Sequence, residues 1–113
     1  MALMIWHNPR CSKSRETLAL LQARGFAPAV RLYLEDAPSR AELAVALAKL
    51  GRPAAELLRW KEADVPAGLT KAAPEAEILD ALAAHPRLIE RPLVLTDRAA
   101  RIGRPPEAVL DIL

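Results

Sequence analysis

The only cysteine of this chain, Cys11, is the side chain with the clearest capacity for chemistry. It lies between a polar turn at residues 7–9 and a helical pattern that begins at Ser12, which places its thiol at a predicted helix N-terminus. Unpaired N–H groups and the positive end of the helix dipole favour a thiolate there. A lone cysteine is more often an inert buried side chain. Here the turn, the helix start and the neighbouring cations favour a reactive sulfur.

Three neighbouring residues are candidates for tuning the pKa of this thiol. Ser14 occupies the position of the second thiol in a Cys-x-x-Cys pair, so an outside thiol must resolve an oxidised Cys11. The Ser14 hydroxyl or backbone N–H can point back and favour the thiolate. His7 has two possible roles, and the sequence leaves both open. A protonated His7 would add a positive charge near the sulfur, or His7 would only hold the turn. Arg15 is a further nearby cation.

The elements that must position these residues follow the order βαβ, then helices, then ββα. Strands are expected at residues 3–6, 29–34, 93–95 and 100–103, the last two forming a hairpin. Helices are expected at residues 12–24, 39–50, 53–59, 74–84 and from 105 to the end, with a loop at 61–71. Ser39 and Glu42 have the spacing of a capping box. The first strand–helix–strand unit implies parallel pairing.

Length and composition predict one α/β domain over residues 1–113, with 52% hydrophobic residues to form its core. A net charge of +2 is too small to predict nucleic-acid binding. One cysteine forms no internal disulfide, and no signal peptide or membrane-spanning run is visible. We therefore expect a cytoplasmic monomer that contacts neither nucleic acid nor membrane.

Several motifs together resemble the glutaredoxin-linked arsenate reductase family, the ArsC/Spx family. Its opening motif matches His7-Asn8-Pro9-x-Cys11-x-x-Ser14-Arg15-x-Thr17-Leu18. Further matches, which cover almost the whole chain, lie at Tyr33-Leu34-Glu35, Pro38-Ser39-Arg40, Leu57-Leu58-Arg59, His85-Pro86, Arg91-Pro92-Leu93-Val94, Arg104-Pro105 and Val109-Leu110-Asp111-Ile112-Leu113. The resemblance implies a thioredoxin-like α/β domain with a helical insertion at about residues 39–84, and it is closest to a branch with Cys-Ser-Lys-Ser-Arg.

The same resemblance implies a chemistry for these residues. Cys11 would be the nucleophile that attacks arsenate, and Arg59, Arg91 and Arg104 would hold the oxyanion. Charge-assisted hydrogen bonds of this kind contribute roughly 1.5–3 kcal/mol each. Glutathione would be the co-substrate and glutaredoxin the protein partner, with no bound cofactor or metal. The resemblance also implies a cis peptide bond before Pro92.

Two departures from the family pattern bear on the substrate. The reductases usually carry Gly-Thr after the cysteine and Lys-Asn after the first arginine, whereas this chain has Ser12-Lys13 and Trp60-Lys61. Whether Lys13, Trp60 and Lys61 redirect specificity is open at this point. One alternative is an Spx-like protein-binding regulator without turnover, which the absence of a Cys-x-x-Cys switch disfavours. Another is a thiol oxidoreductase that acts on a different substrate, such as glutathione mixed disulfides.

Overall fold

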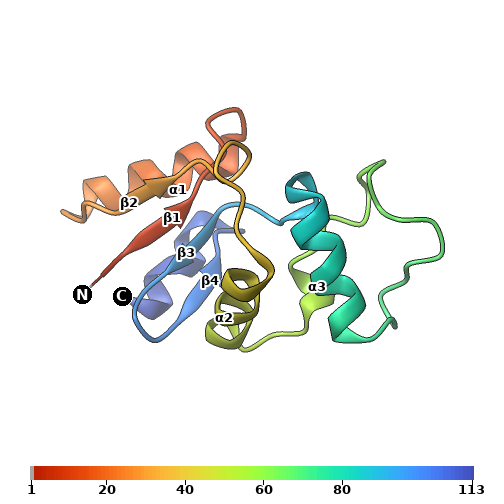
Figure 1. The fold of residues 1–113 in the computed structure, drawn as a ribbon. Coiled ribbons are helices and arrows are strands. Elements are labelled where there is room, and N and C mark those ends of the chain that lie inside the picture. The colour runs from red at the N-terminus through yellow and green to blue at the C-terminus, as the bar shows by residue number, and fades with distance from the viewer. Residues whose placement is uncertain (1) are drawn as a thin grey trace.

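The computed structural model describes residues 2–113 as a four-stranded mixed sheet with helices on both faces (Figure 1). The strands are β1 (Met4–Trp6), β2 (Ala29–Arg31), β3 (Leu93–Leu95) and β4 (Ala100–Ile102), in the spatial order β2-β1-β3-β4. β1 pairs parallel with β2 and antiparallel with β3, and β3 and β4 form the predicted hairpin. The predicted α/β, thioredoxin-like element order is confirmed.

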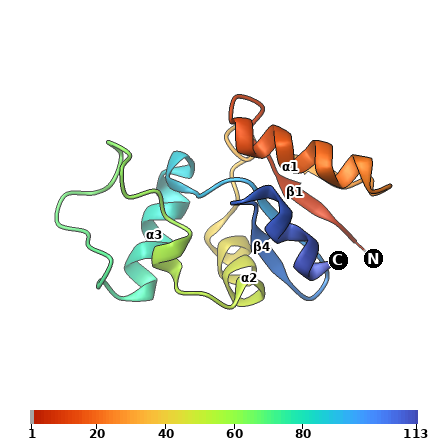
Figure 2. The same ribbon diagram turned by 180° about the vertical axis from the view of Figure 1, so that it is seen from behind.

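The helices divide between the two faces of the sheet. They are α1 (Ser12–Ala23), α2 (Arg40–Leu50), α3 (Glu75–Ala84) and the short 3₁₀ helices η1 (Ala54–Glu56), η2 (Pro86–Leu88) and η3 (Pro106–Ile112). α1 and η3 pack together on one face, as the rear view shows (Figure 2). α2 packs against β4 on the other face, and α3 packs on α2 (Figure 1). Among residues 2–113, no helix has the length and apolarity needed to span a membrane.

Alternation along the strands divides the core into two clusters. Ile5 and Val94 lie on the side of α1, where they pack with Leu21. The cluster formed with α2 and α3 contains Trp6, which follows Ile5 in β1, and Leu93, which precedes Val94 in β3. Successive side chains of a strand point to opposite faces, so β1 and β3 each contribute to both clusters. The sheet is therefore held rigidly from both sides at the end that carries the candidate site.

Local sequence signals determine the limits of α2. The Ser39 side chain accepts a hydrogen bond from the Glu42 N–H at 3.1 Å, and the Glu42 carboxylate accepts one from the Ser39 N–H at 3.0 Å. The predicted capping box is thus confirmed. At the other end, Gly51 adopts the left-handed conformation with φ of 67°, which glycine reaches without steric cost.

Some predicted limits were wrong. The second strand ends at Arg31 rather than at residue 34, because the N–H groups of Glu35 and Asp36 turn back to donate to the Leu32 carbonyl. The helix expected at residues 53–59 is only the single 3₁₀ turn η1, and the C-terminal helix η3 is also 3₁₀. Residues 61–71 contain no helix or strand, as predicted.

Candidate active site

The register of the sheet brings the segments with functional residues to one end. Trp6 at the end of β1 lies opposite Leu93 at the start of β3, and Leu93 lies opposite Ile102 at the end of β4. Trp6 also lies beside Arg31 at the end of β2. The segments that follow β1, β2 and β4 therefore meet the segment that precedes β3. These four segments contain Cys11, Tyr33, Arg104 and Arg91, respectively.

Cys11 is the N-cap residue of α1 and is largely buried, with 9% of the residue's surface exposed. Burial by itself would raise the pKa of the thiol. Four groups outweigh that effect: the N–H of Ser14, the guanidinium of Arg91, the N–H of Lys13 and the guanidinium of Arg104. The pKa of the thiol therefore lies below its ordinary value. A larger thiolate fraction makes the sulfur a better nucleophile near neutral pH.

Arg104 contacts this sulfur, and Arg91 is close enough for its charge to act on it. Arg104 Nη2 is 3.6 Å from Cys11 Sγ, and Arg104 Nε donates to the Arg91 carbonyl at 2.8 Å. Arg91 Nε is buried and has no hydrogen-bond partner among the residues described, which is uncommon for a buried donor. Each arginine precedes a cis proline. The prediction for Pro92 is confirmed, and the second cis bond, at Pro105, was not predicted.

Arg59 reaches the same end of the molecule from the helical region. An isolated antiparallel bridge joins Leu58 to Ile89, and the Arg59 N–H donates to the Leu88 carbonyl at 2.7 Å. This pairing brings Arg59 near Arg91, because residues 57–59 run beside residues 88–90. Arg59 lies in an adjacent cleft of about 540 Å³ rather than on the sulfur itself. The cleft is lined by Asn8, Tyr33, Arg59, Glu62 and two further arginines, Arg10 and Arg87.

Tyr33 connects this cleft to the cysteine, and the sequence analysis gave it no functional role. Its side chain is 1% exposed. Burial raises the pKa of the Tyr33 phenol and the Cys11 charge adds to that increase, whereas Arg91, Arg59 and a hydrogen bond with Asn8 act in the opposite direction. Tyr33 thus lies within electrostatic reach of the sulfur and of two of the three arginines. The available signal was a lone tyrosine at the end of a strand beside the reactive segment.

His7 and Ser14 hold the turn that presents the sulfur. Ser14 Oγ is 2.6 Å from His7 Nδ1 and accepts a hydrogen bond from the Asn8 N–H at 3.0 Å. Burial, assisted by the Arg15 charge, lowers the pKa of His7, so its imidazole is neutral near pH 7. The lowered pKa favours the reading in which His7 holds the turn over that of a positive charge beside the thiolate. The Ser14 hydroxyl is engaged with the turn, and its backbone N–H acts on the sulfur.

The other cations near the start of α1 are directed elsewhere. Arg15 Nη1 donates to the Pro9 carbonyl at 2.8 Å, so it braces the turn from outside. Lys13 Nζ lies 3.4 Å from Glu16 in an exposed pair. Trp60 packs against the larger core cluster and donates from Nε1 to the Ala55 carbonyl at 2.8 Å. These placements follow from side-chain directions that spacing in the sequence does not specify.

Two carboxylates lie against the three arginines, and the sequence analysis did not consider either. Glu90 Oε1 is 3.2 Å from Arg104 Nε and 3.4 Å from Arg91 Nη1. Glu62 Oε1 is 2.7 Å from Arg59 Nη1. Glu90 directly precedes Arg91, and Glu62 follows Arg59 by three residues. These spacings were the signal available in the sequence.

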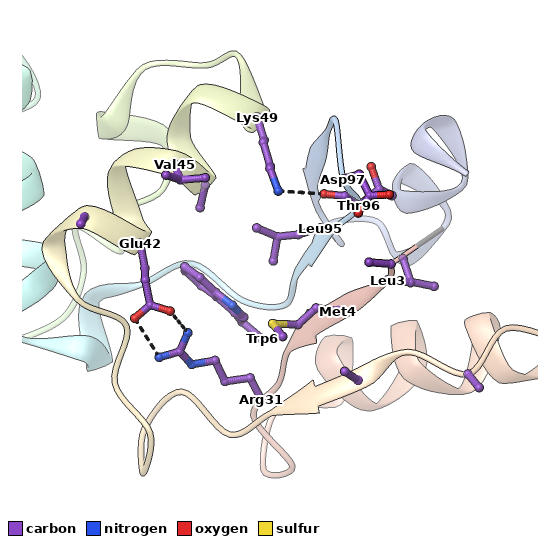
Figure 3. Close-up of a pocket in the computed structure, with 15 residues that line it drawn as sticks. Leu3, Met4, Trp6, Arg31, Glu42, Val45, Lys49, Leu95, Thr96 and Asp97 are labelled. Carbon is purple, nitrogen blue, oxygen red and sulfur yellow. Dashed lines mark hydrogen bonds and ion pairs between the residues drawn. The ribbon is translucent and has the colours of Figure 1, made fainter.

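A larger hollow lies away from this site, between α2 and the sheet (Figure 3). It measures about 690 Å³ and is lined mainly by apolar side chains, including Met4, Trp6 and Val45. Its cations are already paired, since Arg31 binds Glu42 and Lys49 Nζ donates to the Thr96 carbonyl at 3.0 Å. We call this hollow the α2 groove.

Comparisons with known proteins match this chain over nearly its whole length. The model of the ArsC family matches residues 6–112. An arsenate reductase of Haemophilus influenzae is 43% identical over the whole length of both chains. The protein YfgD of Escherichia coli is 49% identical over 96% of this chain and 94% of its own length. The solved structure of an arsenate reductase from Vibrio cholerae superposes with a TM-score of 0.91 and is 46% identical, covering 100% of this chain and 98% of that one.

Proposed function

The chain belongs to the ArsC family, and we propose that it is an arsenate reductase in which Cys11 is the nucleophile. The observation that carries the proposal is the 3.6 Å separation between Arg104 Nη2 and Cys11 Sγ. A guanidinium so close to a sulfur of lowered pKa holds an anion and a nucleophile together. The names of the relatives supply arsenate as the anion.

In the first step, the arginines bind arsenate while the sulfur attacks it. Arg91 and Arg104 hold its oxygens beside Cys11, and Arg59 approaches from the cleft. Each charge-assisted hydrogen bond contributes roughly 1.5–3 kcal/mol, set against the cost of removing the anion from water. The Cys11 thiolate forms a bond to arsenic, and one arsenate oxygen takes up protons and leaves as water. The result is a covalent S–As(V) adduct.

In the second step, an external thiol completes the reduction. The thiolate of glutathione attacks the Cys11 sulfur and forms a mixed disulfide. The S–As bond breaks with its electron pair on arsenic, which departs as arsenite, so arsenic is reduced by two electrons while two sulfurs are oxidised. Glutaredoxin then reduces the mixed disulfide and regenerates Cys11. The chain supplies a single cysteine, which is why the resolving thiol comes from outside.

The test is arsenate-dependent NADPH oxidation in the presence of glutathione, glutaredoxin and glutathione reductase. We expect turnover by the wild-type protein and none by Cys11→Ser. Equal rates for the two proteins would exclude Cys11 as the nucleophile. Turnover of a glutathione mixed disulfide, with none of arsenate, would assign the site to thiol–disulfide exchange instead.

A further inference from the structure

Glu90 occupies an unusual position for a carboxylate in a site that is meant to bind anions. Its Oε1 lies between two guanidinium groups, 3.2 Å from Arg104 Nε and 3.4 Å from Arg91 Nη1. Arg104 presents its Nε edge to Glu90 and its Nη2 to Cys11, so one guanidinium bridges the carboxylate and the sulfur. An oxyanion held by Arg104 beside Cys11 therefore comes within reach of Glu90.

Backbone contacts fix Glu90 in this place. Its N–H donates to the Leu57 carbonyl at 2.6 Å, next to the bridge between Leu58 and Ile89. The side chain retains 23% of its exposure, so it is sheltered but not sealed. With Glu62 on Arg59, the three guanidinium groups and two carboxylates leave one net positive charge. The site is thus less cationic than its arginines alone would make it.

An ionised carboxylate only accepts hydrogen bonds, and this restricts which oxyanion oxygen can face it. A hydroxyl of monohydrogen arsenate or phosphate can donate to Glu90, while the unprotonated oxygens bind the arginines. Sulfate at neutral pH has no proton to donate, so one of its oxygens would face the carboxylate with like charge and without a hydrogen bond. A site built to hydrogen-bond a hydroxyl rejects analogues that lack it.

We propose that Glu90 makes the Cys11 site selective for oxyanions that carry a proton, over fully ionised ones such as sulfate. This inference rests on the proposed oxyanion site and adds a specificity-determining residue to it. Glu62 has a different effect, because its contact is to Arg59 in the adjacent cleft. It reduces the positive charge felt by every anion and does not distinguish protonated from unprotonated oxygens.

The experiment measures how inorganic phosphate and sulfate protect Cys11 from alkylation by iodoacetamide, a neutral reagent. Half-protecting concentrations are compared for the wild type, Glu90→Gln and Glu62→Gln, each normalised to its own unprotected rate. We expect the wild type to favour phosphate, and Glu90→Gln to lose roughly tenfold or more of that preference, the scale of one hydrogen bond to a charged group. We expect Glu62→Gln to strengthen protection by both anions alike and to keep the preference.

Calorimetric titration of phosphate and sulfate in a Cys11→Ser background repeats the comparison without any contribution from the thiol. An unchanged phosphate-to-sulfate ratio in Glu90→Gln, or a wild type without preference, would overturn the role of Glu90 while leaving the oxyanion site in place. A wild type that neither anion protects would remove the oxyanion site itself, and the role of Glu90 with it. Thermal unfolding of each variant verifies that the exchange of an oxygen for an amide leaves the fold intact.

Discussion

The cleft beside Cys11 and the α2 groove are two hollows with opposite chemistry. The groove is the larger, about 690 Å³ against 540 Å³, and its walls are mostly apolar (Figure 3). In the groove, Arg31 and Lys49 are already bound to partners of the same chain. Beside Cys11, by contrast, the buried Arg91 Nε lacks a partner within residues 2–113.

The two regions therefore differ in what their cations contact as well as in the size of the hollow. The cations of the groove contact only partners within the fold, whereas the guanidinium of Arg104, although paired with Glu90, also reaches a sulfur of lowered pKa. Under the proposed function, the chemistry belongs to Cys11 and the arginines near it rather than to the larger groove. Four variants, three of them with a matched control variant, test this contrast.

The largest effect is expected from the neutral substitution Arg104→Met. It removes the charged donor 3.6 Å from the sulfur, and we expect kcat/KM for arsenate to fall about 10- to 100-fold, the scale of one charge-assisted hydrogen bond. Lys49→Met in the α2 groove is the matched control, and its kcat/KM should stay near the wild-type value. Similar losses in both variants would mean that the two regions do not differ in function.

Gly103→Ala should destabilise the end of the sheet on which the site is built. A Cβ at this position would lie 2.6 Å from Thr17 Oγ1 and 2.7 Å from Pro92 Cγ. Overpacking of this kind costs about 1–3 kcal/mol in the free energy of unfolding, and it should also slow alkylation of Cys11 because it displaces the neighbouring Arg104.

Gly68→Ala is the control for Gly103→Ala. Gly68 has a positive φ of 85°, but an added Cβ meets nothing within 4 Å. Chemical denaturation should show a backbone penalty of about 1 kcal/mol, while the alkylation rate of Cys11 stays unchanged. If alkylation of Cys11 is also slower in Gly68→Ala, crowding at the site does not explain the slower alkylation in Gly103→Ala.

The pH dependence of alkylation reports the thiolate directly. The wild-type rate should rise with a midpoint below the pKa of an ordinary thiol, and Arg91→Met should move the midpoint upward, because it removes a charge that lowers the pKa of Cys11. Lys13→Met should leave the midpoint in place, since Lys13 acts through its backbone N–H and its ammonium pairs with Glu16. A midpoint shift in Lys13→Met equal to that in Arg91→Met would contradict this geometry.

The smallest effect is expected in the α2 groove, at Glu42. Its hydrogen bond with Arg31, assisted by the Ser39 N–H, lowers the pKa of the carboxyl to about 2. Because the folded-state pKa lies below the unfolded one, the stabilisation is complete above pH of about 4.5 and is lost as the pH falls through about 2. Unfolding experiments at pH 7 should therefore give the wild type a free energy of unfolding that exceeds that of Glu42→Gln by at most about 1 kcal/mol, since the pair is exposed. This difference should vanish in acid.

Local patterns were enough to predict much of the fold. Capping residues, the glycine after α2 and the apolar runs of β1 and β3 act through near neighbours, so the elements followed from short stretches of sequence. The second strand was overextended at Leu32–Leu34, where exposed apolar side chains resemble a strand but the backbone turns. Hydrophobic periodicity alone does not distinguish these two cases.

The sequence by itself determined that the single thiol lies at a helix N-terminus, because a turn and a helix start are local events. Only the tertiary structure decided which charges meet it. Strand register brought Arg91 and Arg104 to the sulfur, and burial made His7 neutral. The same folding placed Glu90 among the guanidinium groups. Electrostatic interactions depend on distance in space and on exclusion of water, and residues 80 or more positions apart in this chain acquire both only when the sheet forms.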